Sequence, residues 1–295
     1  MSNKQKLLVI IGPTSSGKTS LSIKLAKDFN GEVISADSRQ VYKGMDIGSG
    51  KVTKTEMAGV PHYLLDVVSP KTSFSVAQFV QKADKAIKDI NKKGKLPIIA
   101  GGTMFWVDAL LYGLPKGVKP DSVLRKKLEK LSAEKLLNKL KKLDPVRAKN
   151  IDPHNKRRII RALEIVMISG KPVPKYEKQD KYDYLKLGVK RSKKELDERI
   201  YIRLLARLRQ GMIAEVKRLR EQGVSWQRLD GFGLEYRWVS RYLRGLVSKD
   251  DMIEKLEYAI IHYAKRQMTW LKKDKEIYWQ KDYQKIKNKV DKWLK

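Results

Sequence analysis

The chain has 295 residues, 41% of them hydrophobic, and is long enough to bury one large core or a core with a smaller insertion. It contains no cysteine, which excludes disulfides, iron–sulfur clusters, thiol catalysis and cysteine-ligated zinc, and its three scattered histidines argue against a histidine-built metal site. The 65 Lys and Arg residues against 33 Asp and Glu residues give a net charge of +32, which predicts a polyanionic partner unless a general bias toward surface lysine explains it.

An apolar run at residues 7–11 predicts a buried strand, and it leads directly into a glycine-rich loop. This loop fits the phosphate-binding pattern Gly-x-x-x-x-Gly-Lys-Ser/Thr, and apolar residues at helical spacing follow it over residues 20–29. In that context the N–H groups of the loop and the helix dipole point at a diphosphate, Lys18 reaches the outer phosphate, and the Thr19 hydroxyl is placed on Mg²⁺. The predicted diphosphate- or nucleotide-binding residues are Gly12, Pro13, Thr14, Ser15, Ser16, Gly17, Lys18 and Thr19.

Strand and helix patterns alternate through the first hundred residues. Residues 32–36, 62–67 and 96–100 are predicted strands, and residues 75–92 are predicted to form a helix with an apolar face. This alternation, together with the phosphate loop, predicts an α/β fold with a P-loop NTPase-like parallel sheet flanked by helices.

The pattern changes after Pro115 to lysine- and leucine-rich helices, expected over about 121–143 and over 156–169 with Gly170 at the C-terminal end. Residues 116–179 are therefore predicted to be a helical insertion domain, while residues 1–115 and 180–295 form the P-loop core. Residues 185–189 are expected to rejoin the sheet as a strand. A long helix over 194–222, helical structure over 235–272 and a weak helix over 282–295 complete the prediction.

Polar side chains follow two of the predicted strands, at the edge of a parallel sheet where ligands bind. Asp37-Ser38-Arg39-Gln40 follow one strand and Gly101-Gly102-Thr103 follow another, although Asp37 taken alone is also compatible with a capping role and the glycines with a bare turn. P-loop motors and switches place an acidic residue at the end of an apolar strand to help hold Mg²⁺, whereas the strand 96–100 ends in glycine; Asp66 could serve instead. The pattern favours a transferase that uses a diphosphate or triphosphate.

Six stretches of the chain match the motifs of one family in order: residues 12–19, 37–48, 61–66, 101–103, 157–164 and 264–270, of which 37–48 is the most specific. The chain resembles the bacterial tRNA dimethylallyltransferases, also called isopentenylpyrophosphate:tRNA transferases, over nearly its whole length. The resemblance implies transfer of a dimethylallyl group from dimethylallyl diphosphate to N6 of the adenosine that adjoins the anticodon on its 3′ side. The implied partners are the tRNA anticodon stem-loop and dimethylallyl diphosphate, and the implied cofactor is Mg²⁺.

Roles are carried over from the family motifs position by position. The resemblance implies that Asp37 takes the proton from N6, and that Lys18, Thr19 and Arg207 act on the diphosphate, with Mg²⁺ held at Thr19. The insertion is expected to grip the anticodon stem-loop, since residues 125–158 contain thirteen basic and four acidic side chains. The implied tRNA-binding residues are Asp37, Ser38, Arg39, Gln40, Thr103, Arg125, Arg157, Arg158, Ile159, Ile160, Arg161, Lys265, Arg266 and Gln267.

Simpler explanations stay open for some of these assignments. Arg207 is also compatible with an ordinary surface arginine, and the basic helix at residues 156–169 with a solvated face. The segment 231–236 departs from the segment found in many bacterial relatives, which leaves its contacts open.

Two other functions are compatible with some of the residues. A nucleoside or small-molecule kinase would use the same loop for ATP and Asp37 as base, which explains the loop but not the charge. A non-enzymatic RNA-binding protein explains the charge but leaves Asp37 and Thr103 without a role. The ordered match of several separated motifs favours the prenyltransferase.

The sequence also bears on location and assembly. No apolar run approaches the roughly 18 residues needed to cross a bilayer, so a cytoplasmic location and no membrane partner are expected. The sequence has no extended apolar helix face of the kind that an obligate dimer would bury, so we expect a monomer.

Overall fold

The computed structural model describes residues 4–114, 117–119 and 121–295. Contacts within the chain divide it into two compact units, Met1–Tyr112 with Asp180–Lys295 (unit 1) and Gly113–Gln179 (unit 2). The boundary predicted from the sequence falls at residues 115 and 116, which lie outside the described residues. Across the described ranges, no helix combines the length and apolar character that crossing a membrane requires.

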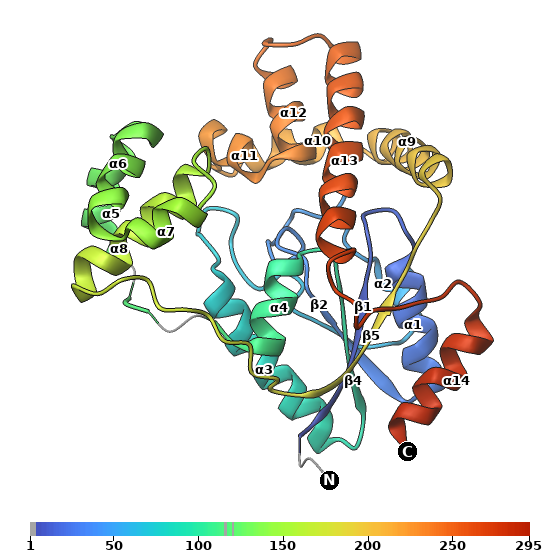
Figure 1. The fold of residues 1–295 in the computed structure, drawn as a ribbon. Coiled ribbons are helices and arrows are strands. Elements are labelled where there is room, and N and C mark those ends of the chain that lie inside the picture. The colour runs from blue at the N-terminus through green and yellow to red at the C-terminus, as the bar shows by residue number, and fades with distance from the viewer. Residues whose placement is uncertain (1–3, 115–116, 120) are drawn as a thin grey trace. The chain divides into compact units, whose positions relative to one another are not determined.

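Unit 1 is built on a six-stranded sheet in the order β3-β2-β4-β1-β5-β6, and every pairing in it is parallel (Figure 1). This confirms the predicted α/β class, and β5 rejoins the sheet beside β1 as expected. Because the strands run the same way, their carboxyl ends share one edge of the sheet. The strands are β1 (Lys6–Ile11), β2 (Gly31–Ser35), β3 (His62–Tyr63), β4 (Leu96–Gly101), β5 (Asp183–Gly188) and β6 (Tyr278–Trp279).

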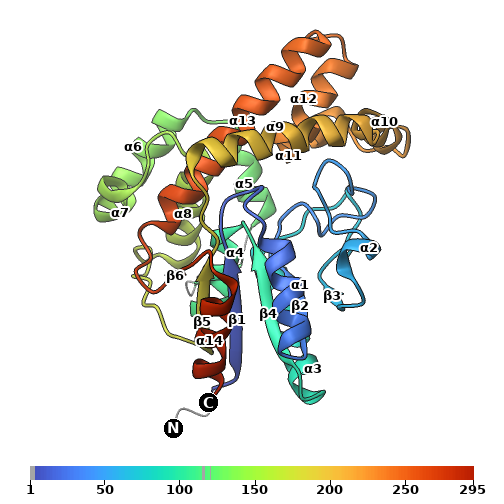
Figure 2. The ribbon, with the colours of Figure 1, turned by 90° about the vertical axis from the view of Figure 1, so that its right-hand side faces the viewer.

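Helices cover both faces of this sheet (Figure 2). Alternate residues of β1 enter two separate apolar cores, as the two-residue period of a strand requires. The larger core includes α3 (Val76–Lys92) and α4 (Met104–Tyr112), and the smaller includes α1 (Lys18–Asp28) and α14 (Tyr283–Leu294). The remaining helices of unit 1 are α2 (Lys54–Met57), α9 (Lys193–Arg209), α10 (Met212–Glu221), α11 (Trp226–Phe232), α12 (Leu234–Leu243) and α13 (Lys249–Leu271).

Several predicted elements differ from the structure in length. The segment 194–222 is two helices rather than one, because Gly211 between α9 and α10 adopts a φ of 97°, which an α-helix does not allow. Gly245, with a φ of 70°, similarly separates α12 from α13. The strand predicted over 62–67 is only two residues long, since Leu64 and Asp66 adopt φ values of 62° and 54°. Helix α4 was not predicted because it is apolar on nearly every side and shows no amphipathic period.

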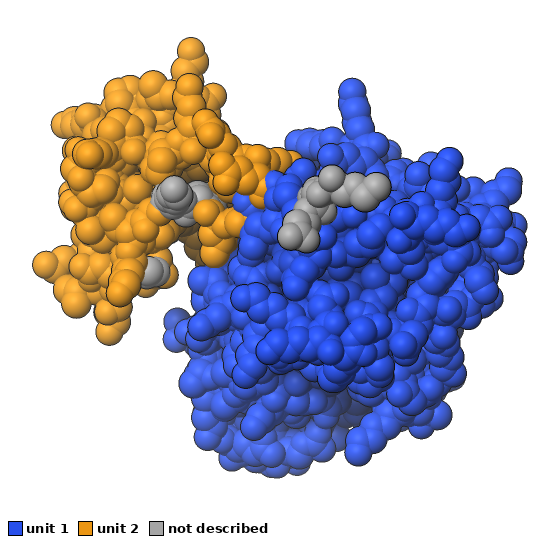
Figure 3. Space-filling model, turned by 90° about the horizontal axis from the view of Figure 1, so that it is seen from below, with its two compact units in different colours: residues 1–112, 180–295 blue, residues 113–179 orange. Residues whose placement is uncertain are grey.

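Unit 2, coloured orange in Figure 3, is a separate compact unit. It is helical and has a core of its own. Each of its helices starts at a residue whose side chain accepts a hydrogen bond from the first turn, and α8 ends at Gly170 as predicted. The core consists mainly of leucine and isoleucine side chains from α5, α6 and α8, together with Ala148 of α7. The helices are α5 (Ser122–Glu129), α6 (Ala133–Leu143), α7 (Pro145–Asn150) and α8 (Lys156–Ser169).

Candidate active site

The phosphate loop connects β1 to α1 at the carboxyl edge of the sheet, which is the context that the motif requires. Gly17 caps α1 with a φ of 101°, a left-handed conformation that favours glycine. Gly12 is needed for a different reason, since a Cβ atom there would lie 2.8 Å from the carbonyl oxygen of Val189. The loop therefore passes close to neighbouring backbone and turns its first helical residues, Lys18 and Thr19, toward the same edge.

Lys18 is half-buried at this edge, and its Nζ donates a hydrogen bond to the carbonyl oxygen of Pro13 at 2.7 Å. Burial, and to a smaller extent the positive charge of Arg203, lowers the pKa of Lys18 from 10.5 to about 8, while Asp37 opposes this shift. No carboxylate in the described part of the chain forms an ion pair with Lys18. An anionic ligand would supply that missing partner.

The affinity for inorganic pyrophosphate should therefore fall as the pH rises above about 8. Lys18 is charged below its pKa, and a neutral amine attracts an anion less strongly, so affinity is retained at lower pH and lost as the proton leaves. Titration calorimetry between about pH 6.5 and 9.5 measures this, with Lys18→Arg as the control because arginine keeps its charge throughout. An identical pH response in the control would show that Lys18 is not responsible.

A cleft at the carboxyl edge brings together several of the residues of unit 1 that the sequence singles out. Thr14, Ser15, Lys18 and Thr19 line it from the phosphate loop, and Asp37 faces them from the end of β2. The other lining residues are Ser35, Gln40, Ser49, Gly50, Ala100, Gly101, Gly102, Arg203, Tyr263 and Gln267.

Asp37 is held by the backbone that follows it. Its Oδ1 accepts hydrogen bonds from the N–H groups of Arg39 and Gln40 at 2.7 and 3.3 Å, and Oδ2 has no hydrogen bond to any described residue. Thr103 supports the same turn, since its Oγ1 accepts a hydrogen bond from the N–H of Ser38 at 3.2 Å. The turn fixes the orientation of the carboxylate and leaves one oxygen free for a ligand.

Helix α13 contributes two side chains to the cleft. The amide of Gln267 accepts a hydrogen bond from the N–H of Thr14 and donates one to the carbonyl oxygen of Gly102, each at 2.8 Å, so it ties together the loops that follow β1 and β4. Lys265 and Arg266 are exposed beside it. Tyr263 lies one turn earlier, and burial raises the pKa of its phenol to about 12. Tyr263 is not among the residues predicted from the sequence, although its four-residue spacing from Gln267 places both on one helix face.

The arginine that lines this cleft is Arg203 of α9, which the sequence analysis also missed. Its Nη2 donates to the carbonyl oxygen of Gly50 at 3.3 Å. Arg207, one turn later, is buried and donates through Nη1 to Glu235 at 2.8 Å and to the carbonyl oxygen of Gly48 at 3.3 Å. The carboxylate of Glu235 thus offsets the charge of Arg207, whereas Arg203 faces the phosphate loop.

A second cleft lies on the other side of the phosphate loop and shares Lys18, Thr19 and Arg203 with the first. Arg199 lines it, and its Nε donates to the carbonyl oxygen of Ser15 at 2.8 Å. Burial, and to a smaller extent the positive charge of Arg207, lowers the pKa of Arg203 to about 10. The loop is therefore surrounded by positive charge that an anionic ligand would stabilise.

The basic residues selected in unit 2 fall into two groups. Arg125 and Arg161 both donate to one oxygen of the buried Glu164, at 2.6 and 3.3 Å, and their side chains stay partly exposed. Arg157 and Arg158 are exposed, and no described residue forms an ion pair with either.

Ile159 and Ile160 are a correction to the sequence prediction. Their side chains are 0% and 4% exposed and lie in the core of unit 2, so they have no surface to offer to a nucleic acid. The family resemblance implies tRNA contact for the whole motif 157–161, whereas the helical period turns its two apolar members inward.

A parallel sheet whose first strand runs into a phosphate loop, with a carboxylate across the resulting cleft, defines an enzyme of the P-loop class. The family model described as IPP transferase matches residues 40–274. The chain belongs to the IPP transferase family, and it is a transferase.

Known proteins support this membership over nearly the full length. The chain is 42% identical over 281 residues to a tRNA dimethylallyltransferase of Anoxybacillus flavithermus, covering 93% of this chain and 90% of the relative. Its structure is similar to the full-length tRNA isopentenylpyrophosphate transferase of Bacillus halodurans, with a TM-score of 0.76, 37% identity and coverage of 99% and 97% of the two chains. It is also similar to a eukaryotic dimethylallyltransferase acting on tRNA, with a TM-score of 0.82, 30% identity and coverage of 93% and 73%.

Proposed function

We propose that the chain transfers a dimethylallyl group from dimethylallyl diphosphate to N6 of the adenosine that follows the anticodon of a tRNA. The observation that carries this proposal is that the phosphate loop, Arg203 and Asp37, which has one free oxygen, line the same cleft. The cleft thus offers positive charge for a diphosphate on one side and a base on the other. The relatives of this chain are named as tRNA dimethylallyltransferases, which supports tRNA as the acceptor substrate.

In the proposed reaction the diphosphate is the leaving group. The adenine amine is a weak nucleophile because its lone pair is delocalised into the ring, so cleavage of the bond between C1 of the allyl group and oxygen must be assisted. Lys18, Arg203 and the loop N–H groups stabilise the negative charge that develops on the departing diphosphate, whereas the charge of Arg207 is offset by Glu235. The N6–C1 bond forms as the C1–O bond breaks, and Oδ2 of Asp37 accepts the N6 proton.

The acceptor base must leave its stack to reach this cleft, at a cost of a few kcal/mol. We assign Tyr263 to contact with the base, because it is the one aromatic side chain among the described residues that line the cleft. The turn of residues 37–40 and Thr103 would surround the same base. In unit 2, Arg157 and Arg158 are free to bind phosphates of the anticodon stem, and Arg125 and Arg161 present partly exposed guanidinium groups. Lys265 and Arg266 are proposed as further tRNA contacts.

Mg²⁺ is proposed as the cofactor. The described residues contain no cluster of three or more His, Cys, Asp or Glu side chains that could hold a metal ion. Mg²⁺ commonly needs only one or two protein oxygens in addition to substrate phosphates and water, and the hydroxyl of Thr19 and the carboxylate of Asp37 both line the cleft. The hydroxyl of Thr19 fits such a site, with Oδ2 of Asp37 kept for the N6 proton, and a bound Mg²⁺ would neutralise charge on the diphosphate.

The decisive experiment incubates the purified full chain and Mg²⁺ with unmodified tRNA and either dimethylallyl diphosphate or labelled ATP. We expect a mass gain on the adenosine after the anticodon with the isoprenoid donor only, and no gain on a tRNA that has guanosine at that position. Transfer of phosphate from ATP without prenylation would instead indicate a kinase and overturn the proposal.

A further inference from the structure

We infer that Glu215 of α10 is a positioning residue for the reaction: it holds the loop of residues 45–51 so that this loop orients Arg203 toward the phosphate loop. The inference rests on the proposed function, because Arg203 is assigned there to the diphosphate. Glu215 lies outside the cleft, and no motif used in the sequence analysis includes it.

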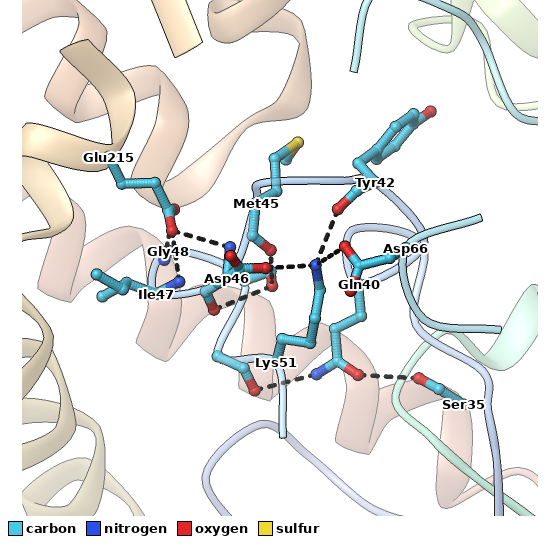
Figure 4. A network of polar contacts seen from close by, with 12 residues as sticks. Ser35, Gln40, Tyr42, Met45, Asp46, Ile47, Gly48, Lys51, Asp66 and Glu215 are labelled. Carbon is cyan, nitrogen blue, oxygen red and sulfur yellow. Dashed lines mark hydrogen bonds and ion pairs between the residues drawn. The ribbon is translucent and has the colours of Figure 1, made fainter. Parts of the chain in front are cut away.

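Glu215 binds the loop through both carboxylate oxygens, as Figure 4 shows. Its Oε2 accepts hydrogen bonds from the N–H groups of Asp46 and Ile47 at 2.9 and 2.7 Å, and its Oε1 accepts one from the N–H of Gly48 at 3.0 Å. The hydroxyl of Tyr236 donates to Oε1 as well, at 3.0 Å. Three successive backbone amides thus converge on one side chain from another element.

The chemistry of this contact requires a carboxylate. Glu215 is 1% exposed, and no Lys or Arg of the described residues forms an ion pair with it, so the charge is stabilised by hydrogen-bond donors alone. An amide of the same size would turn its own N–H₂ group toward one or two of these donors. Because bonds to a buried carboxylate are stronger than bonds between neutral groups, replacing it loosens the loop.

The same loop presents carbonyl oxygens to the arginines of α9. The carbonyl oxygen of Gly50 accepts from Arg203 at 3.3 Å and from Gln40 at 3.1 Å, and that of Gly48 accepts from Arg207 at 3.3 Å. The fit is close, since a Cβ atom on Gly50 would clash with the guanidinium groups of Arg207 and Arg203. Movement of the loop would therefore move the guanidinium that lines the cleft.

Lys51 holds the other end of the loop. Its Nζ donates to Asp46 at 2.6 Å, to Asp66 at 2.5 Å and to the carbonyl oxygen of Tyr42 at 2.9 Å (Figure 4). With that end tied independently, loss of Glu215 should release residues 46–50 rather than unfold the surrounding structure.

The test compares Glu215→Gln with Glu221→Gln, an exposed glutamate on the same helix. We expect Glu215→Gln to raise the KM for dimethylallyl diphosphate and the Kd for inorganic pyrophosphate by about tenfold, with the KM for tRNA changed less than about twofold. Amide hydrogen exchange of residues 46–48 should become at least about tenfold faster. Glu221→Gln should match the wild type in all of these measurements.

Tyr236→Phe keeps the ring and removes only the hydrogen bond that the tyrosine hydroxyl donates to Glu215. It is the second test variant, with a smaller perturbation, if Glu215→Gln does not fold. It should raise the same two donor constants by about two- to threefold. The inference would be overturned if either variant raised the KM for tRNA as much as the KM for dimethylallyl diphosphate. It would also be overturned if amide exchange at residues 46–48 became faster while the KM for dimethylallyl diphosphate and the Kd for pyrophosphate stayed unchanged. Pyrophosphate binding and exchange do not need prenyl transfer, so they test Glu215 even if the proposed function fails.

Discussion

Replacing Asp37 by asparagine should lower the turnover number for prenyl transfer by about 10³-fold while tRNA affinity changes less than about threefold. The asparagine oxygen can still accept the hydrogen bonds that Asp37 Oδ1 receives from Arg39 and Gln40, so the turn is retained. The amide cannot take the N6 proton, so only the proton transfer is lost. Single-turnover rates with saturating tRNA measure the chemical step, and filter binding measures tRNA affinity.

Asp37→Ala separates the two roles of this side chain further. It removes both the proton acceptor and the hydrogen bonds to the turn, so it should reduce turnover at least as much and also weaken tRNA binding modestly. A parallel loss of turnover and tRNA affinity in Asp37→Asn would contradict the assignment of Asp37 as the base.

Arg203→Ala should lower kcat/KM for dimethylallyl diphosphate by about 10²- to 10³-fold. Arg203 lines the cleft beside Lys18, so its charge stabilises the departing diphosphate directly. Affinity for tRNA should stay within about threefold of the wild-type value, because the lost interaction is with dimethylallyl diphosphate. Steady-state kinetics with each substrate varied in turn would separate the two effects.

Arg207 is the matched comparison on the same helix. Removing it alone would leave Glu235 buried without its partner, so the charge-neutral double variant Arg207→Gln with Glu235→Gln is the suitable control. We expect that double variant to lose less than about tenfold in kcat/KM for the donor. A larger loss there than in Arg203→Ala would assign the diphosphate to Arg207, as the family resemblance implies.

Features encoded in short contiguous stretches could be predicted. The phosphate loop depends on eight consecutive residues and the elements beside them, so its strand–loop–helix context followed from the pattern. Asp37 follows a buried strand, and the parallel sheet brings that strand end to the same edge as the loop. The helical period of residues 156–169 also predicts that Ile159 and Ile160 face inward, although the family motif taken as a whole implies tRNA contact for both.

Contacts between distant segments could not be predicted from these patterns. Gln267 is 253 positions from Thr14, and nothing local to either residue indicates their hydrogen bond. The choice between Arg203 and Arg207 depends on how α9 packs against the loop of residues 45–51 and on Glu235 from α12.

The amino-acid order alone thus established the α/β class, the phosphate loop and the carboxylate at the end of the second strand, because each depends on neighbours along the chain. The tertiary structure determined that Arg203 faces the phosphate loop and that the Gln267 amide links the segments after β1 and β4. It also determined that the buried Glu215 holds residues 46–48. The physical reason is that buried polar groups must find hydrogen-bond partners, and those partners come from whichever segments the core packs beside them.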